Sequence, residues 1–250
     1  DPDRWTTSAG FGDVDVDGDL DLFVCAYVEW SRAIDEQLAF TLNGVDRAYG
    51  PPTAYAGTFS TLFRNDGETS FTDVSEQAGI HVTNPATGLP MGKALGVVFV
   101  DVDVDGWPDI AVANDTVQNH LFHNRGDGTF DEIGLESGMG FDGNGRATGA
   151  MGIDVADFRN DGGIGVCIGN FANEMSSLYV RTGTRLGFTD DAMGEGIGSP
   201  SRLKLSFGLF FFDYDLDGRQ DLLQVNGHLE ETINEVQPSQ HYLQAPQLFW

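Results

Sequence analysis

The sequence predicts an all-β protein made of repeated four-stranded units, and three observations support this. Short runs of β-branched and aromatic residues alternate with turn residues, and 33 of the 250 residues are glycine. One aspartate-rich segment recurs four times along the chain. The last two intervals between its copies are equal, which indicates a structural unit of fixed length.

The aspartate-rich copies set the length of this unit. They begin at Asp13, Asp101, Asp157 and Asp213, which lie 88, 56 and 56 residues apart. The unit is therefore 56 residues long, and the first copy contains additional residues. The flanks repeat too, because every copy is followed by a leucine–aromatic pair, at 62–63, 121–122, 178–179 and 248–249.

Each unit is predicted to form four short strands, which in the second copy fall at about 95–101, 109–114, 119–124 and 129–133. A repeated four-stranded unit is typical of a β-propeller blade. An immunoglobulin-like sandwich would explain the short strands but not the 56-residue period. We predict one β-propeller region over 1–250, with about four blades at 8–75, 95–133, 150–192 and 206–250, the last one incomplete, and with inserted loops at 30–57 and 228–246.

The composition limits the possible partners. The formal net charge is −26, from 39 acidic residues against 13 lysines and arginines, which opposes binding to nucleic acid or to an anionic membrane surface. No apolar stretch approaches the roughly 18 residues needed to span a bilayer. Two cysteines, Cys25 and Cys167, are too few for a disulfide scaffold and are predicted to fill the core.

Three of the four aspartate-rich segments have the pattern D-x-D-x-D-G-x-x-D, and we call the four segments loop 1 (13–21), loop 2 (101–109), loop 3 (157–165) and loop 4 (213–221). In a tight turn the alternate carboxylates converge, and the glycine permits the positive φ of the turn. Hard oxygen donors suit Ca²⁺. The predicted ligands are the aspartates at positions 1, 3, 5 and 9 and the backbone carbonyl at position 7: Asp13, Asp15, Asp17, Asp19 and Asp21 in loop 1, Asp101, Asp103, Asp105, Trp107 and Asp109 in loop 2, and Asp213, Asp215, Asp217, Arg219 and Asp221 in loop 4.

An EF-hand is excluded, since its twelve-residue loop ends in glutamate and lies between helices. The twelfth positions here are Val24, Val112 and Gln224, and strand-forming residues follow position 9.

Loop 3 departs from the pattern and is predicted to be a weak or lost metal site. Arg159 stands at position 3 and Gly165 at position 9, which leaves only Asp157 and Asp161. We expect Arg159 to replace the ion by pairing with these two aspartates, and the alternative is a weak fourth calcium site.

The loops resemble the FG-GAP (VCBS-type) repeats of integrin α-subunit propellers and of many secreted bacterial proteins. Residues beyond the loops resemble the ASPIC/UnbV and cartilage acidic protein group, namely the Leu-Phe-Arg-Asn-Asp-Gly run at 62–67, the segment at 71–74 with Ala78 and Gly79, and Asn226-Gly-His at 226–228. The resemblance implies a calcium-binding propeller without an assigned ligand. Because integrin-like propellers have seven blades, it also leads us to expect that this chain is part of a larger ring, completed by further blades or by another chain.

The long connections of the first and fourth units are predicted to share the face opposite the calcium loops. Long loops on a rigid scaffold are common binding sites. A protein or glycan ligand is therefore expected on this face, where basic residues suggest an anionic group. The candidate residues are Arg47, Tyr49, Lys93, Arg146, Lys204 and His228.

The sequence thus favours a non-enzymatic, calcium-binding recognition or adhesion module. No phosphate-binding loop, nucleophile elbow or HExxH motif is present, and no catalytic residue is assigned. One alternative is a carbohydrate-active enzyme similar to propeller-type polysaccharide lyases, using His228, Tyr49 and Arg146; another is an architectural module of a larger surface protein. Because weak calcium sites fill only at extracellular calcium concentrations, the expected location is secreted, periplasmic or at the cell surface.

Overall fold

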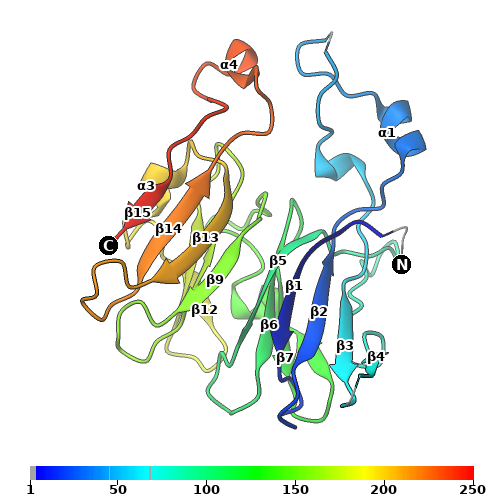
Figure 1. The fold of residues 1–250 in the computed structure, drawn as a ribbon, viewed down its shortest axis with the longest axis vertical. Helices are drawn as coiled ribbons and strands as arrows, with labels where there is room; N and C mark the ends of the chain where they lie inside the picture. Colours follow the sequence, from blue (N-terminus) through cyan, green and yellow to red (C-terminus); the bar gives the residue numbers. More distant parts are fainter. Residues whose placement is uncertain (1–3, 45, 68) are drawn as a thin grey trace.

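The computed structural model describes residues 4–44, 46–67 and 69–250 and consists of four antiparallel sheets placed side by side (Figure 1). Three sheets have four strands and the last has three, each in sequential order. The predicted all-β, propeller-type architecture is confirmed. The strands of the first two sheets are β1 (Thr6–Gly12), β2 (Asp21–Ala26), β3 (Thr61–Asn65), β4 (Phe71–Asp73), β5 (Ala94–Val100), β6 (Asp109–Asn114), β7 (His120–Asn124) and β8 (Phe130–Glu132). Those of the last two are β9 (Ile153–Ala156), β10 (Gly165–Ile168), β11 (Ser177–Arg181), β12 (Phe188–Asp190), β13 (Ser206–Phe212), β14 (Asp221–Asn226) and β15 (Gln247–Phe249).

The first strands of the four blades form the inner wall, since β1 lies beside β5, β5 beside β9, and β9 beside β13. The glycine five residues before loop 2 and before loop 3 explains this close approach in two blades. A Cβ on Gly96 would lie 2.6 Å from the carbonyl oxygen of Met151, and one on Gly152 would lie 2.6 Å from that of Phe207. Only glycine lets adjacent inner strands come this near.

The core lies between neighbouring blades. Phe23 and Leu62 of blade 1 pack in one cluster with Ile110 and Phe122 of blade 2. A second cluster joins blades 2 and 3, and a third joins blades 3 and 4. Cys25 and Cys167 are fully buried free thiols within these clusters, in accordance with the prediction.

The insertions contain short helices that the sequence analysis did not predict. Helix α1 (Arg32–Leu38) begins at Ser31, whose hydroxyl accepts a hydrogen bond from the backbone N–H of Ile34 at 3.2 Å, as an N-cap does. Helix α4 (Ile233–Val236) lies in the insertion of blade 4. Both insertions project from one end of the blades, while loops 1 and 2 turn at the other (Figure 1). The remaining helical turns are η1 (Pro52–Ala54), α2 (Gly134–Ser137) and α3 (Gly198–Ser201).

No helix among the described residues is long and apolar enough to cross a membrane.

Replacing Phe122 by alanine tests the contact between blades 1 and 2. The side chain is 1% exposed and its ring lies 6.4 Å from that of Phe23, so the variant should lose ~3–5 kcal/mol of unfolding free energy. Guanidinium denaturation measures this loss. Phe71→Ala is the control, because Phe71 is 45% exposed and its loss should cost less than ~1 kcal/mol. Equal losses in the two variants would contradict the assignment of the core.

Candidate metal centres and binding cleft

All four aspartate-rich loops have the same backbone conformation. The residue at position 4 has a positive φ in each loop, from 53° at Asn160 to 62° at Leu216, and so does the glycine at position 6. The position-1 aspartate holds the turn, since its two oxygens accept the backbone N–H groups of positions 5 and 6. In loop 2, for example, Asp105 and Gly106 donate to Asp101 at 3.1 and 2.8 Å. These bonds also occur in loop 3, so the turn itself does not require the full set of aspartates.

The position-9 aspartate ties the loop to the third strand of its blade. Asp109 is 1% exposed, and it accepts hydrogen bonds from the backbone N–H groups of Val102 at 2.9 Å and Asn124 at 2.7 Å. Asp21 makes the same two contacts in loop 1. Burial raises the pKa of Asp109 to about 6 and also raises that of Asp21. These carboxylates therefore occupy sites where a nearby cation would offset the cost of their charge.

In loops 1, 2 and 4, which have all four aspartates, the carboxylates converge as the spacing of the aspartates predicts. One oxygen from each of three aspartates lies within 4.8 Å of the others, and these triads are Asp13, Asp15 and Asp17 in loop 1, Asp101, Asp103 and Asp109 in loop 2, and Asp213, Asp215 and Asp221 in loop 4. Asp15 and Asp103, both at position 3, each have a buried Oδ1 without a hydrogen-bond partner. A hard divalent cation would satisfy these oxygens.

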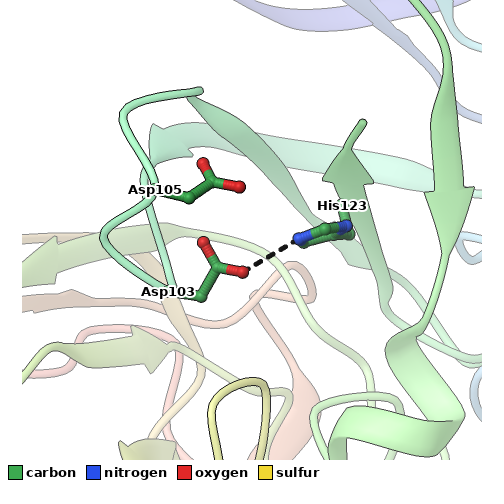
Figure 2. Close-up of side chains that lie close together, drawn as sticks. All are labelled: Asp103, Asp105 and His123. Atoms are coloured by element: carbon green, nitrogen blue, oxygen red, sulfur yellow. Dashed lines mark hydrogen bonds and ion pairs between the residues drawn. The ribbon is translucent and has the colours of Figure 1, made fainter. Parts of the chain in front are cut away.

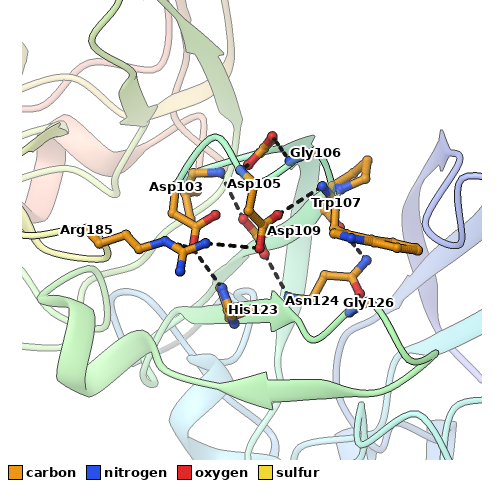
Figure 3. Close-up of polar contacts among 12 residues, drawn as sticks. Asp103, Asp105, Gly106, Trp107, Asp109, His123, Asn124, Gly126 and Arg185 are labelled. Atoms are coloured by element: carbon orange, nitrogen blue, oxygen red, sulfur yellow. Dashed lines mark hydrogen bonds and ion pairs between the residues drawn. The ribbon is translucent and has the colours of Figure 1, made fainter.

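The position-7 residues were predicted to act through their carbonyls. Their backbone N–H groups donate to the position-5 aspartate, at 2.9 Å for Asp19, 3.0 Å for Trp107 and 2.8 Å for Arg219. The Trp107 indole packs on Gly126, where an added Cβ would lie 2.8 Å from the ring (Figure 3).

The predicted pairing of Arg159 within loop 3 is wrong. Its guanidinium instead forms ion pairs with Glu195 and, at 3.3 Å, with Asp191, both from the segment after β12. At position 9 of loop 3, the Phe158 ring fills the space that an aspartate side chain would occupy. A Cβ added to Gly165 would lie 2.5 Å from this ring. Loop 3 keeps the turn through Asp157, while Asp161 accepts the N–H of Gly163 at 2.8 Å.

An arginine does reach a complete loop, but it is Arg185. From the turn after β11, its Nε lies 2.9 Å from Asp103 Oδ2 and its Nη2 3.2 Å from Asp105 Oδ2 (Figure 3). Arg185 is 80 residues from Asp105, so no local pattern indicated this contact.

Asn65 and Asn124 were also assigned no role by the sequence analysis. Besides their backbone bonds to the position-9 aspartates, the Asn124 amide donates to the carbonyls of Pro108 at 2.9 Å and of Val14 at 2.8 Å. The latter contact joins blade 2 to loop 1. The shared Leu-Phe-x-Asn pattern at 62–65 and 121–124 was the available signal.

A cleft of about 410 Å³ lies between the two insertions. The segments after β2 and β14 are linked across it, since the backbone N–H of Tyr49 donates to Glu230 Oε1 at 2.8 Å. Aromatic side chains and carboxylates line the cleft together, among them Tyr27, Phe40, Tyr49, Phe171, Asp115 and Glu174.

The charged side chains deepest in this cleft are acidic. Asp115 is 8% exposed and accepts a hydrogen bond from the Tyr27 hydroxyl at 2.5 Å, and burial raises its pKa to about 6. Burial likewise raises the pKa of Glu174, which accepts the backbone N–H of Gly149 at 2.7 Å.

The six residues proposed for the ligand face do not form one basic cluster. Tyr49 and His228 line the cleft together, and burial lowers the pKa of His228. Arg47 pairs with Asp35 in a neighbouring pocket, and Lys93 is buried with Nζ donating to the Pro52 carbonyl at 2.6 Å. Arg146 and Lys204 do not line the cleft. The three residues considered for a lyase, His228, Tyr49 and Arg146, are therefore not assembled there.

Sequential four-stranded sheets joined by aspartate-rich turns define a propeller-type array of blades. Residues 101–164, from the start of loop 2 to the eighth position of loop 3, match the family model described as FG-GAP-like repeat. Human cartilage acidic protein 1 is 31% identical over 112 residues, and its mouse counterpart is 29% identical over 109 residues. These alignments cover 45% and 44% of this chain and 15% of each relative.

The comparisons confirm the resemblance to the FG-GAP-repeat and cartilage acidic protein group. Neither the family description nor either relative's name denotes an enzyme.

Removing Arg185 should strengthen cation binding at loop 2. In Arg185→Gln no guanidinium competes for Asp103 and Asp105, so the calcium affinity predicted for this loop should rise about two- to fivefold, the range expected for a partly exposed ion pair. Isothermal titration calorimetry measures the affinity. Arg125→Gln is the control, because Arg125 pairs with Asp131 instead. An affinity that does not change in Arg185→Gln would contradict this competition.

Proposed function

We propose that this chain is a calcium-stabilised recognition module that works outside the cell. The observation that carries the calcium assignment is the buried, unpartnered oxygen of Asp15 and Asp103 at the same position of two loops. Each belongs to a triad of carboxylates, and Ca²⁺ accepts several such oxygens at variable geometry. Loops 1, 2 and 4 would each hold one ion, whereas loop 3 lacks the donors at positions 3 and 9.

The role of the ions is structural in this proposal. Asp109 and Asp21 connect each loop to the third strand, so an ion bound beside them would join two strands of one blade. Weak sites of this kind fill at millimolar calcium, which supports a secreted, periplasmic or cell-surface location.

The recognition surface in this proposal is the cleft between the insertions, at the end of the blades opposite the calcium loops. Aromatic rings and hydrogen-bonding carboxylates around about 410 Å³ suit a polyhydroxyl glycan or a polar peptide. The buried Asp115 and the half-buried Glu174 oppose an anionic ligand, so uncharged or cationic ligands fit better than the anionic group suggested by the sequence.

Calcium removal provides the test of the metal assignment. With three weak sites filled at about 1 mM Ca²⁺, chelation should lower the melting temperature by about 10 °C, and equilibrium dialysis should find three ions per chain. Differential scanning fluorimetry measures the shift, with Mg²⁺ in place of Ca²⁺ as the control. A melting temperature indifferent to chelator would refute the structural role of calcium.

Replacing Tyr49 tests the cleft. Its side chain is 72% exposed, so Tyr49→Ala should fold normally but lose about tenfold or more of the affinity for any glycan that the wild type binds. A microarray of neutral and acidic glycans identifies the ligand, and Phe71→Ala serves as the control for a lost exposed aromatic ring. Binding restricted to acidic glycans and unaffected by Tyr49→Ala would refute the cleft as the glycan site.

A further inference from the structure

A histidine ring lies beside the aspartates of loop 2. His123 is in β7, and its Nε2 lies 3.0 Å from Asp103 Oδ2 (Figure 2). His123, Asp103 and Asp105 each offer one donor atom, and the three atoms lie within 4.8 Å of one another. The carboxylates of Asp103 and Asp105 and the imidazole of His123 are directed toward one another from a loop and a neighbouring strand (Figure 2). Loop 2 thus combines two oxygen donors with a nitrogen donor.

The other blades have no imidazole at this place. The strand register makes Phe122 equivalent to Phe63, Tyr179 and Phe249, because these residues pair with corresponding positions of the second strands. The residue that follows is His123 in blade 2 but Arg64, Val180 and Trp250 in blades 1, 3 and 4. The nitrogen donor is therefore specific to loop 2.

The buried carboxylate of Asp103 is independent evidence for a cation site. It is 7% exposed, its Oδ2 faces His123 and Arg185, and its Oδ1 has no hydrogen-bond partner. A buried carboxylate oxygen without a donor is costly unless a cation or water completes its environment. Asp15 has the same open oxygen in loop 1, so the histidine is what distinguishes the two loops.

The carboxylates of Asp103 and Asp105 already attract a positive group. Arg185 presents its guanidinium to Asp103 and Asp105, at 2.9 and 3.2 Å, and its side chain is 63% exposed. An exposed side chain can swing into solvent when a divalent ion takes its place. A divalent ion can therefore replace the Arg185 guanidinium beside Asp103 and Asp105.

We propose that Asp103, Asp105 and His123 form a mixed nitrogen–oxygen site for a divalent transition metal of the zinc class. Imidazole nitrogen is a preferred ligand of Zn²⁺ and Co²⁺, whereas Ca²⁺ takes oxygen ligands. Loops 1 and 4 offer only oxygen donors and favour Ca²⁺, so in this proposal Zn²⁺ replaces Ca²⁺ at loop 2 alone. The ion at loop 2 leaves a position open to water or to a group from a partner, because three protein ligands do not complete a tetrahedral shell.

The experiment is a titration of the metal-stripped chain with Zn²⁺, and with Co²⁺ as a spectroscopic substitute, at about 1 mM Ca²⁺ to keep the oxygen-only loops filled. Calorimetry should find one zinc ion per chain, and Co²⁺ should give visible absorption of a nitrogen-containing site. In His123→Gln the zinc affinity should fall about tenfold or more, while calcium affinity changes less than about twofold. His241→Gln is the matched control, since His241 is exposed and lies in the insertion of blade 4.

A gain-of-function variant makes the test independent of any folding defect in His123→Gln. Arg64→His places an imidazole at the equivalent position of loop 1 and should add a second zinc ion per chain. Zinc affinity that is unchanged in His123→Gln, or reduced equally in His241→Gln, would overturn the proposal, as would the absence of any gain in Arg64→His. The melting shift caused by calcium is measured separately, so failure of the zinc site leaves the calcium assignment to its own test.

Discussion

Three of the four blades depend on how the carboxylate at position 9 of their loop is placed. This side chain is almost fully buried, and in loops 1 and 2 it accepts one N–H from the start of its own loop and one from the third strand. A charge in such a place is costly without a counter-charge. The same group therefore connects the loop to the third strand and favours a cation beside it. Loop 3 shows the alternative, where Gly165 and the Phe158 ring replace the carboxylate.

Side-chain contacts also join the loops to neighbouring blades. Asn124 donates to a carbonyl of loop 1, and Arg185 of blade 3 pairs with loop 2 of blade 2. Asn160 of loop 3 donates to the Gly218 carbonyl of loop 4 at 2.7 Å. An ion bound in one loop would thus stabilise contacts between blades as well as strands within a blade.

The two ends of the blade array offer different chemistry. One end presents turns with converging carboxylates. The other end presents the two insertions (Figure 1), which a hydrogen bond from the Tyr49 backbone N–H to Glu230 links. The cleft there is aromatic and acidic, and its basic neighbours are engaged in local pairs, such as Arg47 with Asp35. A rigid repeat scaffold with variable long loops is a common arrangement for binding proteins, because the loops change without disturbing the core.

The repeated four-stranded units, the aspartate turns and the burial of both cysteines could be predicted from the sequence. These features depend on spacing within a single unit, where a glycine, an alternation of apolar residues or a ladder of aspartates acts locally. Tertiary structure alone decided that His123 and Arg185 meet Asp103, that Arg159 turns to Glu195, and that the cleft is acidic rather than basic. The physical reason is that such contacts join side chains from different strands and blades, and their partners are set by blade packing, which no local pattern encodes.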